Sequence, residues 1–118
     1  MEKIVERGLL YDFYKELLTS HQRSIYEEAV FQDLSLSEIA DDFSISRQGV
    51  HDIIKRCDKL LYEYEEKLHL VEKFIKIQEN AKEINLILDE MKQIGEHDLL
   101  MQKCDEIRVL SDGMIEEL

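Results

Sequence analysis

The sequence predicts an all-α protein, and three observations carry that prediction. Its 118 residues include no proline and only four glycines, the two residue types least compatible with a helix interior. Apolar residues recur three and four positions apart along most of the chain, which is the spacing of one helical face. No segment of useful length alternates between apolar and polar residues as a half-buried strand would. We therefore expect a four-helix N-terminal unit followed by a C-terminal helical hairpin.

Two helices are expected in the first third of the chain. The first covers residues 4–18. Its apolar stripe consists of Val5, Leu9, Phe13 and Leu17, with Leu10 and Tyr14 beside it. Thr19 and Gln22 then have the spacing of a capping box, in which each side chain bonds the backbone amide of the other residue. The second helix is expected at about residues 21–33.

The next segment has the pattern of a helix-turn-helix. Ser35 and Glu38 form a second capping box, which opens a short helix ending near Asp42, and Ser46 caps a long helix that begins at Arg47. The motif needs a small residue where its helices cross, and buried aliphatic residues on both helices. The residues in these positions are Ile39, Ala40, Ile45, Val50 and Ile53.

Ser44 lies in the turn of this motif, at a position where glycine is common. A left-handed backbone conformation at this serine would carry some strain, because only glycine adopts it without steric cost.

The second half of the chain contains two further apolar stripes. They change phase near Lys67–Leu70, which indicates either a helix break or a change of the packed face. Gly95 is expected to end the second long helix, and a last helix is expected at about residues 98–111, before Gly113, with Leu100, Cys104, Ile107 and Leu110 on one face. We therefore divide the chain into a helix-turn-helix domain, residues 1–68, and an acidic helical hairpin, residues 69–118.

The hairpin has two uses that the sequence leaves open. It packs on the first domain, or it pairs two copies of the chain in a homodimer through residues 70–112, because its apolar residues exceed what one helical seam buries.

The long helix from residue 47 carries the candidate nucleic-acid-binding residues. Successive side chains are about 100° apart around a helix, so the polar residues point away from Val50, Ile53 and Cys57. The candidates are Arg47, Gln48, His51, Lys55, Arg56 and Lys59. Arginine pairs with guanine or phosphate and glutamine with adenine. Asp52 lies on the same side and repels phosphates.

Charge limits how such a surface would work. The net charge is −12, and residues 1–60 carry 8 basic and 12 acidic side chains against 7 and 15 in residues 61–118. General phosphate binding depends on lysine and arginine, so the whole chain is not a generic nucleic-acid binder. Between Arg47 and Lys59 the basic residues exceed Asp52 and Asp58 by two. The alternative is that this side of the helix is simply solvated.

We expect no enzymatic activity, no cofactor and no metal site. The four histidines are widely separated, the glycines are isolated, and no cysteine has a histidine at a recognisable catalytic spacing. Cys57 and Cys104 are expected to be buried free thiols in a reducing cytoplasm. The first residues do not form the apolar core of a secretory signal, and no apolar run reaches the length of a membrane helix.

Two resemblances rest on these residues. The stretch "LSLSEIADDFSISRQGVHDIIKR" is similar to the promoter-reading fourth region of sigma factors, so the fold is expected to be a sigma region 4-like helix-turn-helix unit with a C-terminal helical hairpin. From Leu10 to Leu68 the chain more closely resembles the small bacterial YlxM family, including "LYDFYKELLTSHQRSIYEEAVFQDL" and "YEEKL".

The YlxM resemblance implies an accessory or regulatory role in the signal recognition particle pathway. Its implied partners are the particle's RNA and proteins. The alternative function is a transcriptional regulator that reads duplex DNA through the side chains of Arg47, Gln48, His51 and Lys55.

Overall fold

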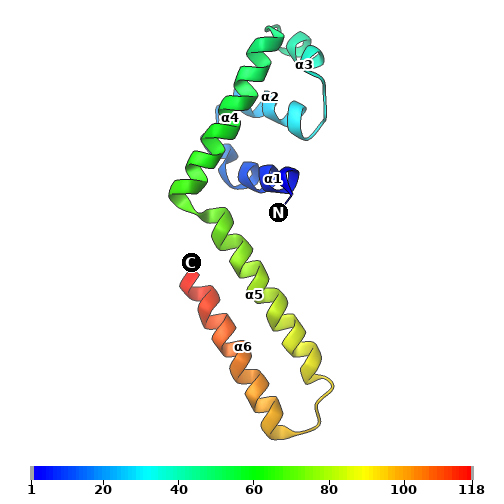
Figure 1. Cartoon of the computed structure of the whole chain (residues 1–118), viewed down its shortest axis with the longest axis vertical. Helices are drawn as coiled ribbons and strands as arrows, with labels where there is room; N and C mark the ends of the chain where they lie inside the picture. Colours follow the sequence, from blue (N-terminus) through cyan, green and yellow to red (C-terminus); the bar gives the residue numbers. More distant parts are fainter. Residues whose placement is uncertain (1, 118) are drawn as a thin grey trace. The chain divides into compact units, whose positions relative to one another are not determined.

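The computed structural model describes residues 2–117, and within this range every regular element is helical, which confirms the all-α prediction. The elements in chain order are α1 (Lys3–Tyr14), the short 3-10 helix η1 (Lys15–Leu17), α2 (Ser20–Val30), α3 (Leu36–Phe43), α4 (Arg47–Leu68), α5 (Leu70–Met91) and α6 (His97–Glu117) (Figure 1). The chain divides into two compact units, Met1–His69 and Leu70–Leu118.

The core of the first unit lies where α2, α3 and α4 meet. Ile25, Ile39 and Val50 have no exposed surface, and Ala40 is 6% exposed. Partly buried residues pack around them: Ala29, Leu34, Leu36, Phe43, Ile45, Ile53 and Ile54. This arrangement confirms the expected helix-turn-helix core, because a small residue on α3 faces an aliphatic residue on α4.

Helix α1 buries a different face from the one predicted. Val5 is 50% exposed and Leu17 is 51% exposed, whereas the buried residues of this segment are Leu10, Tyr11, Tyr14 and Leu18. The buried tyrosines pack their rings in the unit and donate their hydroxyl protons: Tyr11 to Glu27, and Tyr14 to Glu65 at 2.5 Å. Hydroxyl partners on α2 and α4 therefore favour the tyrosine face over the purely aliphatic stripe.

A left-handed residue separates α4 from α5. His69 has φ 58° and ψ 28°, and its amide donates to the Glu65 carbonyl at 2.8 Å. The change of apolar phase near Lys67–Leu70 is therefore a helix break, and the stretch from residue 47 to residue 94 contains two helices.

The second unit is a hairpin of α5 and α6, which lie side by side in antiparallel directions (Figure 1). Two of its boundaries differ from the prediction. Helix α5 ends at Met91, four residues before Gly95, where short-range bonds such as Gln93 N–H to the Glu90 carbonyl tighten the chain. Gly113 lies inside α6, because one glycine costs a helix only about 1 kcal/mol relative to alanine.

The two cysteines have different environments. Cys57 is fully buried on α4, as expected, but Cys104 is exposed. The expectation of two buried thiols was therefore wrong for Cys104, because α6 turns Leu100, Lys103 and Ile107 toward α5 and leaves Cys104 beside that seam. Both cysteines are free thiols. None of the helices in residues 2–117 combines the length and the apolar character needed to cross a membrane.

Candidate nucleic-acid interface

The turn between α3 and α4 is held by backbone geometry and by one serine cap. Ser44 has φ 55° and ψ 43°, so it adopts the left-handed conformation that is strained for a serine, and the amide of Ile45 donates to the Ala40 carbonyl at 3.1 Å. The Ser46 hydroxyl accepts the Gly49 amide at 2.9 Å. Because Ser46 satisfies an amide that the first turn leaves free, α4 begins sharply at Arg47.

The side of α4 that points away from the core carries every predicted site residue. Arg47, Gln48, His51, Lys55, Arg56 and Lys59 are all exposed. The opposite side of the same helix buries Val50, Cys57 and Leu61. The distinction between the inner and outer sides of the helix therefore matches the sequence-based prediction.

The candidates do not all share one line. Gln48, Lys55 and Lys59 follow one another along the side opposite Val50, given about 100° per residue. His51 and Arg56 lie on opposite flanks of that row, and Arg47 occupies the first position of the helix.

Asp52 organises the first two turns of this surface. The Gln48 amide donates from Nε2 to Asp52 Oδ1 at 2.9 Å, and His51 Nδ1 lies 3.8 Å from the same oxygen. Beside these residues is a shallow hollow of about 410 Å³. Leu36, Arg47, Gln48 and His51 line it. Asp52 therefore helps to orient polar side chains, in addition to offsetting the charge of the basic residues on this side of α4.

The outer side of α4 is more basic than the sequence count indicates. Asp58 points toward α1 and α2 rather than outward, so between residues 47 and 59 only Asp52 remains to offset four basic side chains. Lys59 lies 4.0 Å from Glu63. Within residues 2–117, Arg47, Lys55 and Arg56 form no ion pair.

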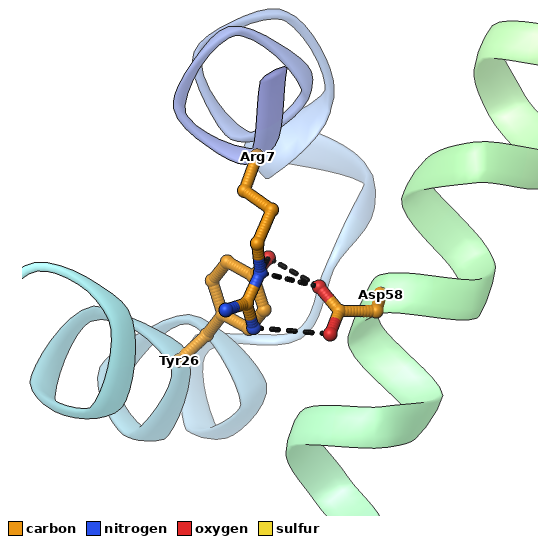
Figure 2. Close-up of polar contacts among 3 residues, drawn as sticks. All are labelled: Arg7, Tyr26 and Asp58. Carbon is orange, nitrogen blue, oxygen red and sulfur yellow. Dashed lines mark hydrogen bonds and ion pairs between the residues drawn. The ribbon is translucent and has the colours of Figure 1, made fainter. Parts of the chain in front are cut away.

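A cluster of three residues fixes α4 against the two helices that precede the motif (Figure 2). The Arg7 guanidinium donates to both carboxylate oxygens of Asp58, at 3.1 and 3.0 Å, and the Tyr26 hydroxyl donates to Asp58 Oδ1 at 2.6 Å. The guanidinium carbon also lies 5.4 Å from the centre of the Tyr26 ring. The three residues come from α1, α2 and α4, so this cluster sets how α4 is presented.

Contacts within the cluster keep Arg7 and Tyr26 protonated. Burial lowers the pKa of Arg7, but the hydrogen bonds and charges of Tyr26 and Asp58 outweigh burial and raise it. Burial raises the pKa of Tyr26 well above its usual range, and the hydrogen bond to Asp58 adds to this effect. The tyrosine therefore stays a hydroxyl donor at physiological pH.

Sequence reasoning missed this cluster. Arg7, Tyr26 and Asp58 are 19 to 51 residues apart, and no local spacing relates them. The sequence held one hint: Asp58 is an acidic residue on an otherwise basic stretch of helix, where it would weaken binding to phosphates.

The described residues offer no clear place for a metal ion. In residues 2–117, no three or more histidine, cysteine, aspartate or glutamate side chains gather where they could hold one.

Comparison with known proteins identifies relatives over most of the chain. Residues 1–103 match a family described as "UPF0122: Putative helix-turn-helix protein, YlxM / p13 like". A UPF0122 protein of Clostridium kluyveri is 48% identical over 91 residues, which cover 77% of this chain and 82% of the relative. A UPF0122 protein of Bacillus cereus strain AH187 is 43% identical over 96 residues, which cover 81% of this chain and 87% of the relative. A UPF0122 protein of Bacillus anthracis has the same identity and coverage.

These similarities agree with the geometry of α3 and α4, and they include the whole of the first unit. The matched residues contain both capping boxes, the left-handed turn and the outer side of α4. The chain belongs to the UPF0122 family of YlxM/p13-like helix-turn-helix proteins.

Proposed function

We propose that this protein is a non-enzymatic, cytoplasmic accessory protein of the signal recognition particle pathway that contacts nucleic acid through the outer side of α4. The observation that carries the nucleic-acid part is a set of exposed cations. Arg47, Lys55 and Arg56 have no ion pair within residues 2–117, and the carboxylate of Asp58 is bonded to Arg7 on the inner side. Cations of this kind displace counterions from phosphates.

The start of α4 supports contact with bases or phosphates. In helix-turn-helix proteins, the first residues of the second helix approach base edges. The positive end of the helix dipole adds to the charge of Arg47 there. Gln48 uses one Nε2 proton for Asp52 and keeps a second donor and its carbonyl oxygen, the pair that adenine recognition requires.

The pathway part of the proposal comes from the resemblance to the YlxM family. It favours the particle's RNA as the ligand. The major groove of double-stranded RNA is too deep and narrow for a helix to read, so we propose that α4 contacts RNA phosphates, a loop or a distorted groove. The acidic remainder of the chain would oppose non-specific binding to other nucleic acids.

A second candidate function is a transcriptional regulator that reads duplex DNA. The position of Arg47 and Gln48 at the start of α4 favours it, because this end of the helix enters the major groove in such proteins. Base reading would then depend on Arg47, Gln48, His51 and Lys55, and Arg56 and Lys59 would contact the backbone.

Protein partners complete the proposal. Proteins of the particle that carry basic RNA-binding surfaces suit the acidic hairpin, since opposite potentials favour association. We also retain the pairing of two copies through residues 70–112.

The test is a salt-titrated binding assay with the full chain. It compares signal recognition particle RNA, random RNA of equal length and genomic duplex DNA fragments. Preference for the particle RNA at about 0.15 M salt, where exposed charges are screened beyond about 8 Å, is the result we expect. Retention of one discrete DNA fragment would establish the second candidate instead, and binding to none would end the nucleic-acid proposal.

Matched variants connect the assay to α4. The double variant Arg47→Ala/Lys55→Ala should weaken binding at least about tenfold, since contacts of this class are worth roughly 1–3 kcal/mol each. Lys73→Ala/Lys82→Ala removes the same charge from the hairpin and should have little effect. Equal losses in both would show that overall charge, and not this surface, accounts for binding.

A further inference from the structure

The hairpin of α5 and α6 buries very little apolar surface. Among residues 70–117, only Val71 is buried, and α6 contributes no buried residue. The exposed apolar side chains include Leu86, Leu88, Leu99, Met101, Val109 and Ile115. Two helices cannot enclose a core between them, and an apolar surface left open in this way is typical of an interaction site.

Cross-helix ion pairs define the seam of the hairpin. Lys103 Nζ lies 2.8 Å from Glu90, and Lys76 Nζ lies 2.9 Å from Glu117. Both pairs fit one antiparallel register. The partly buried seam residues recur at helical spacing: Ile77, Ile84 and Met91 on α5, and Leu100, Lys103, Ile107, Leu110 and Met114 on α6.

One side of the hairpin has a net negative charge. A groove on this side is lined by Glu83, Ile87, Glu106, Val109 and Leu110. Successive residues are about 100° apart around a helix. The residue immediately before each seam residue therefore lies on this side of the hairpin, on both helices. This acidic side carries Glu83, Glu90 and Glu106 against Lys76, a net charge of −2.

The opposite side mixes polar and apolar residues and is balanced in charge. It consists of the residues that immediately follow seam residues, and we call it the neutral side. Its members are Gln78, Asn85 and Lys92 on α5 and Met101, Cys104, Arg108, Ser111 and Ile115 on α6, with Leu88 beside them.

Each of the two cations of the neutral side has an acidic partner on its own helix. Lys92 lies 3.8 Å from Asp89, and Arg108 lies 4.0 Å from Asp105. Exposed apolar residues lie on the same side, with Met101 52% exposed and Ile115 65% exposed.

We propose that the neutral side binds the neutral side of a second copy of this chain, so that two hairpins form an antiparallel four-helix bundle. This inference rests on the proposed pairing of two copies through residues 70–112; it names the surface that carries the pairing and extends it to Ile115. A two-fold interface brings the same surface together twice, so a side with net charge would repel itself. The neutral side meets this condition and the acidic side does not.

The dimensions suit such an interface. Helix α5 has 22 residues and is therefore about 33 Å long, and two helices of about 10 Å diameter present a face of about 660 Å² before its corrugation is counted. A typical stable interface buries about 800 Å² of accessible surface per partner. Pairing would also bury Cys104, which gives the proposal a chemical readout.

Sedimentation velocity of the full chain from about 1 to 200 µM tests the proposal. We expect a concentration-dependent dimer. Ile115→Glu and Met101→Glu should each raise its dissociation constant at least about tenfold, because each replaces an apolar contact with two carboxylates buried in one interface. Alkylation of Cys104 should be slower in the dimer, and Ile115→Glu should remove that protection.

Val109→Glu is the matched control. Val109 is 71% exposed on the acidic side of α6, and the variant adds the same charge as Ile115→Glu, so the dimer should persist. A dimer broken only by Val109→Glu would overturn the assignment of the neutral side. A wild-type chain that stays monomeric up to 200 µM would overturn the pairing itself, and it would leave the nucleic-acid proposal untouched because that assay uses variants of α4.

Discussion

The orientation of the Asp58 side chain changes the net charge on the outer side of α4. Asp58 accepts hydrogen bonds from Arg7 and Tyr26 while it sits on the same helix as the candidate site residues. The side chains of Arg7 and Asp58 are 22% and 32% exposed. A charge-assisted, two-pronged pair at this depth is stronger than a fully exposed pair. It therefore ties α4 to α1 and removes one negative charge from the outer side.

Replacing Asp58 with alanine should destabilise the first unit by about 1–3 kcal/mol, because Arg7 and Tyr26 lose their shared acceptor in a partly buried site. Urea unfolding followed by circular dichroism measures the change. Asp52→Ala removes an exposed aspartate from the same helix and should change the free energy of unfolding by no more than about 0.5 kcal/mol. Equal effects of the two variants would contradict a structural role for the cluster.

The two thiols should differ in reactivity and in pH response. Burial raises the pKa of Cys57 to about 11, with the charge of Asp58 adding to it. A raised pKa means that this thiol's contribution to stability is present below about pH 8.5, where the unfolded thiol begins to ionise, and is lost as pH rises through about 11.

In dilute solution a thiol reagent should therefore modify Cys104 quickly and Cys57 only after unfolding. The free energy of unfolding should fall between pH 8 and pH 10, and Cys57→Ala should make that fall shallower. Two fast thiols in the folded chain, or an unchanged pH slope in the variant, would be inconsistent with the buried environment of Cys57.

At the scale of elements, two serines two residues apart perform opposite functions at the helix-turn-helix turn. Ser44 ends α3 in a left-handed conformation, which costs a non-glycine residue roughly 1–2 kcal/mol. Ser46 begins α4 in an extended conformation and caps it through its hydroxyl. The first serine is a source of strain, and the second removes an unsatisfied amide.

Ser44→Gly should consequently stabilise the protein, by up to about 1 kcal/mol after the extra freedom of glycine in the unfolded chain is subtracted. Ser46→Ala should cost about 1 kcal/mol, the usual value of an N-terminal cap. Thermal and urea unfolding of the two variants measure both effects. A loss of stability in Ser44→Gly would show that the side chain of Ser44 makes a contact more valuable than the strain.

At the scale of the whole molecule, charge is distributed unevenly. The chain carries a net charge of −12, yet the outer side of α4 between residues 47 and 59 is positive, and the inward turn of Asp58 makes it more so. An acidic protein can therefore offer phosphates a confined basic surface. The rest of its surface repels them, which limits binding away from that site.

The salt dependence of DNA binding should reflect this confinement. Four cations on one α4 surface predict that the slope of log K against log salt is no steeper than about −3.6, because each phosphate contact contributes about −0.9. Arg47→Ala should make the slope shallower by about 0.9, and Lys82→Ala should leave it unchanged. A bound dimer would double the limit, so the slope is measured alongside the oligomeric state, and a steeper slope would show that other surfaces contact the phosphates.

Local chemistry accounts for what the sequence predicted well. The capping boxes at Thr19 and Ser35, the left-handed Ser44 and the outward position of Lys55 each depend on residues a few positions apart. Helical periodicity and hydrogen bonds of this range are set by the chain near each residue. For this reason the helix order and the exposed side of α4 were predictable before any tertiary contact was known.

Contacts between distant segments decided the rest. Helix α1 buries Tyr11 and Tyr14 because Glu27 and Glu65 accept their hydroxyl protons, and Cys104 is exposed because α6 turns its neighbours toward α5. The sequence by itself determined the helices, their caps and the basic residues on the outer side of α4. Only the tertiary structure decided which helix faces are buried, and only it showed that Arg7 holds Asp58 away from the outer side of α4. The physical reason is that these contacts join residues up to 51 positions apart, which no local sequence pattern relates.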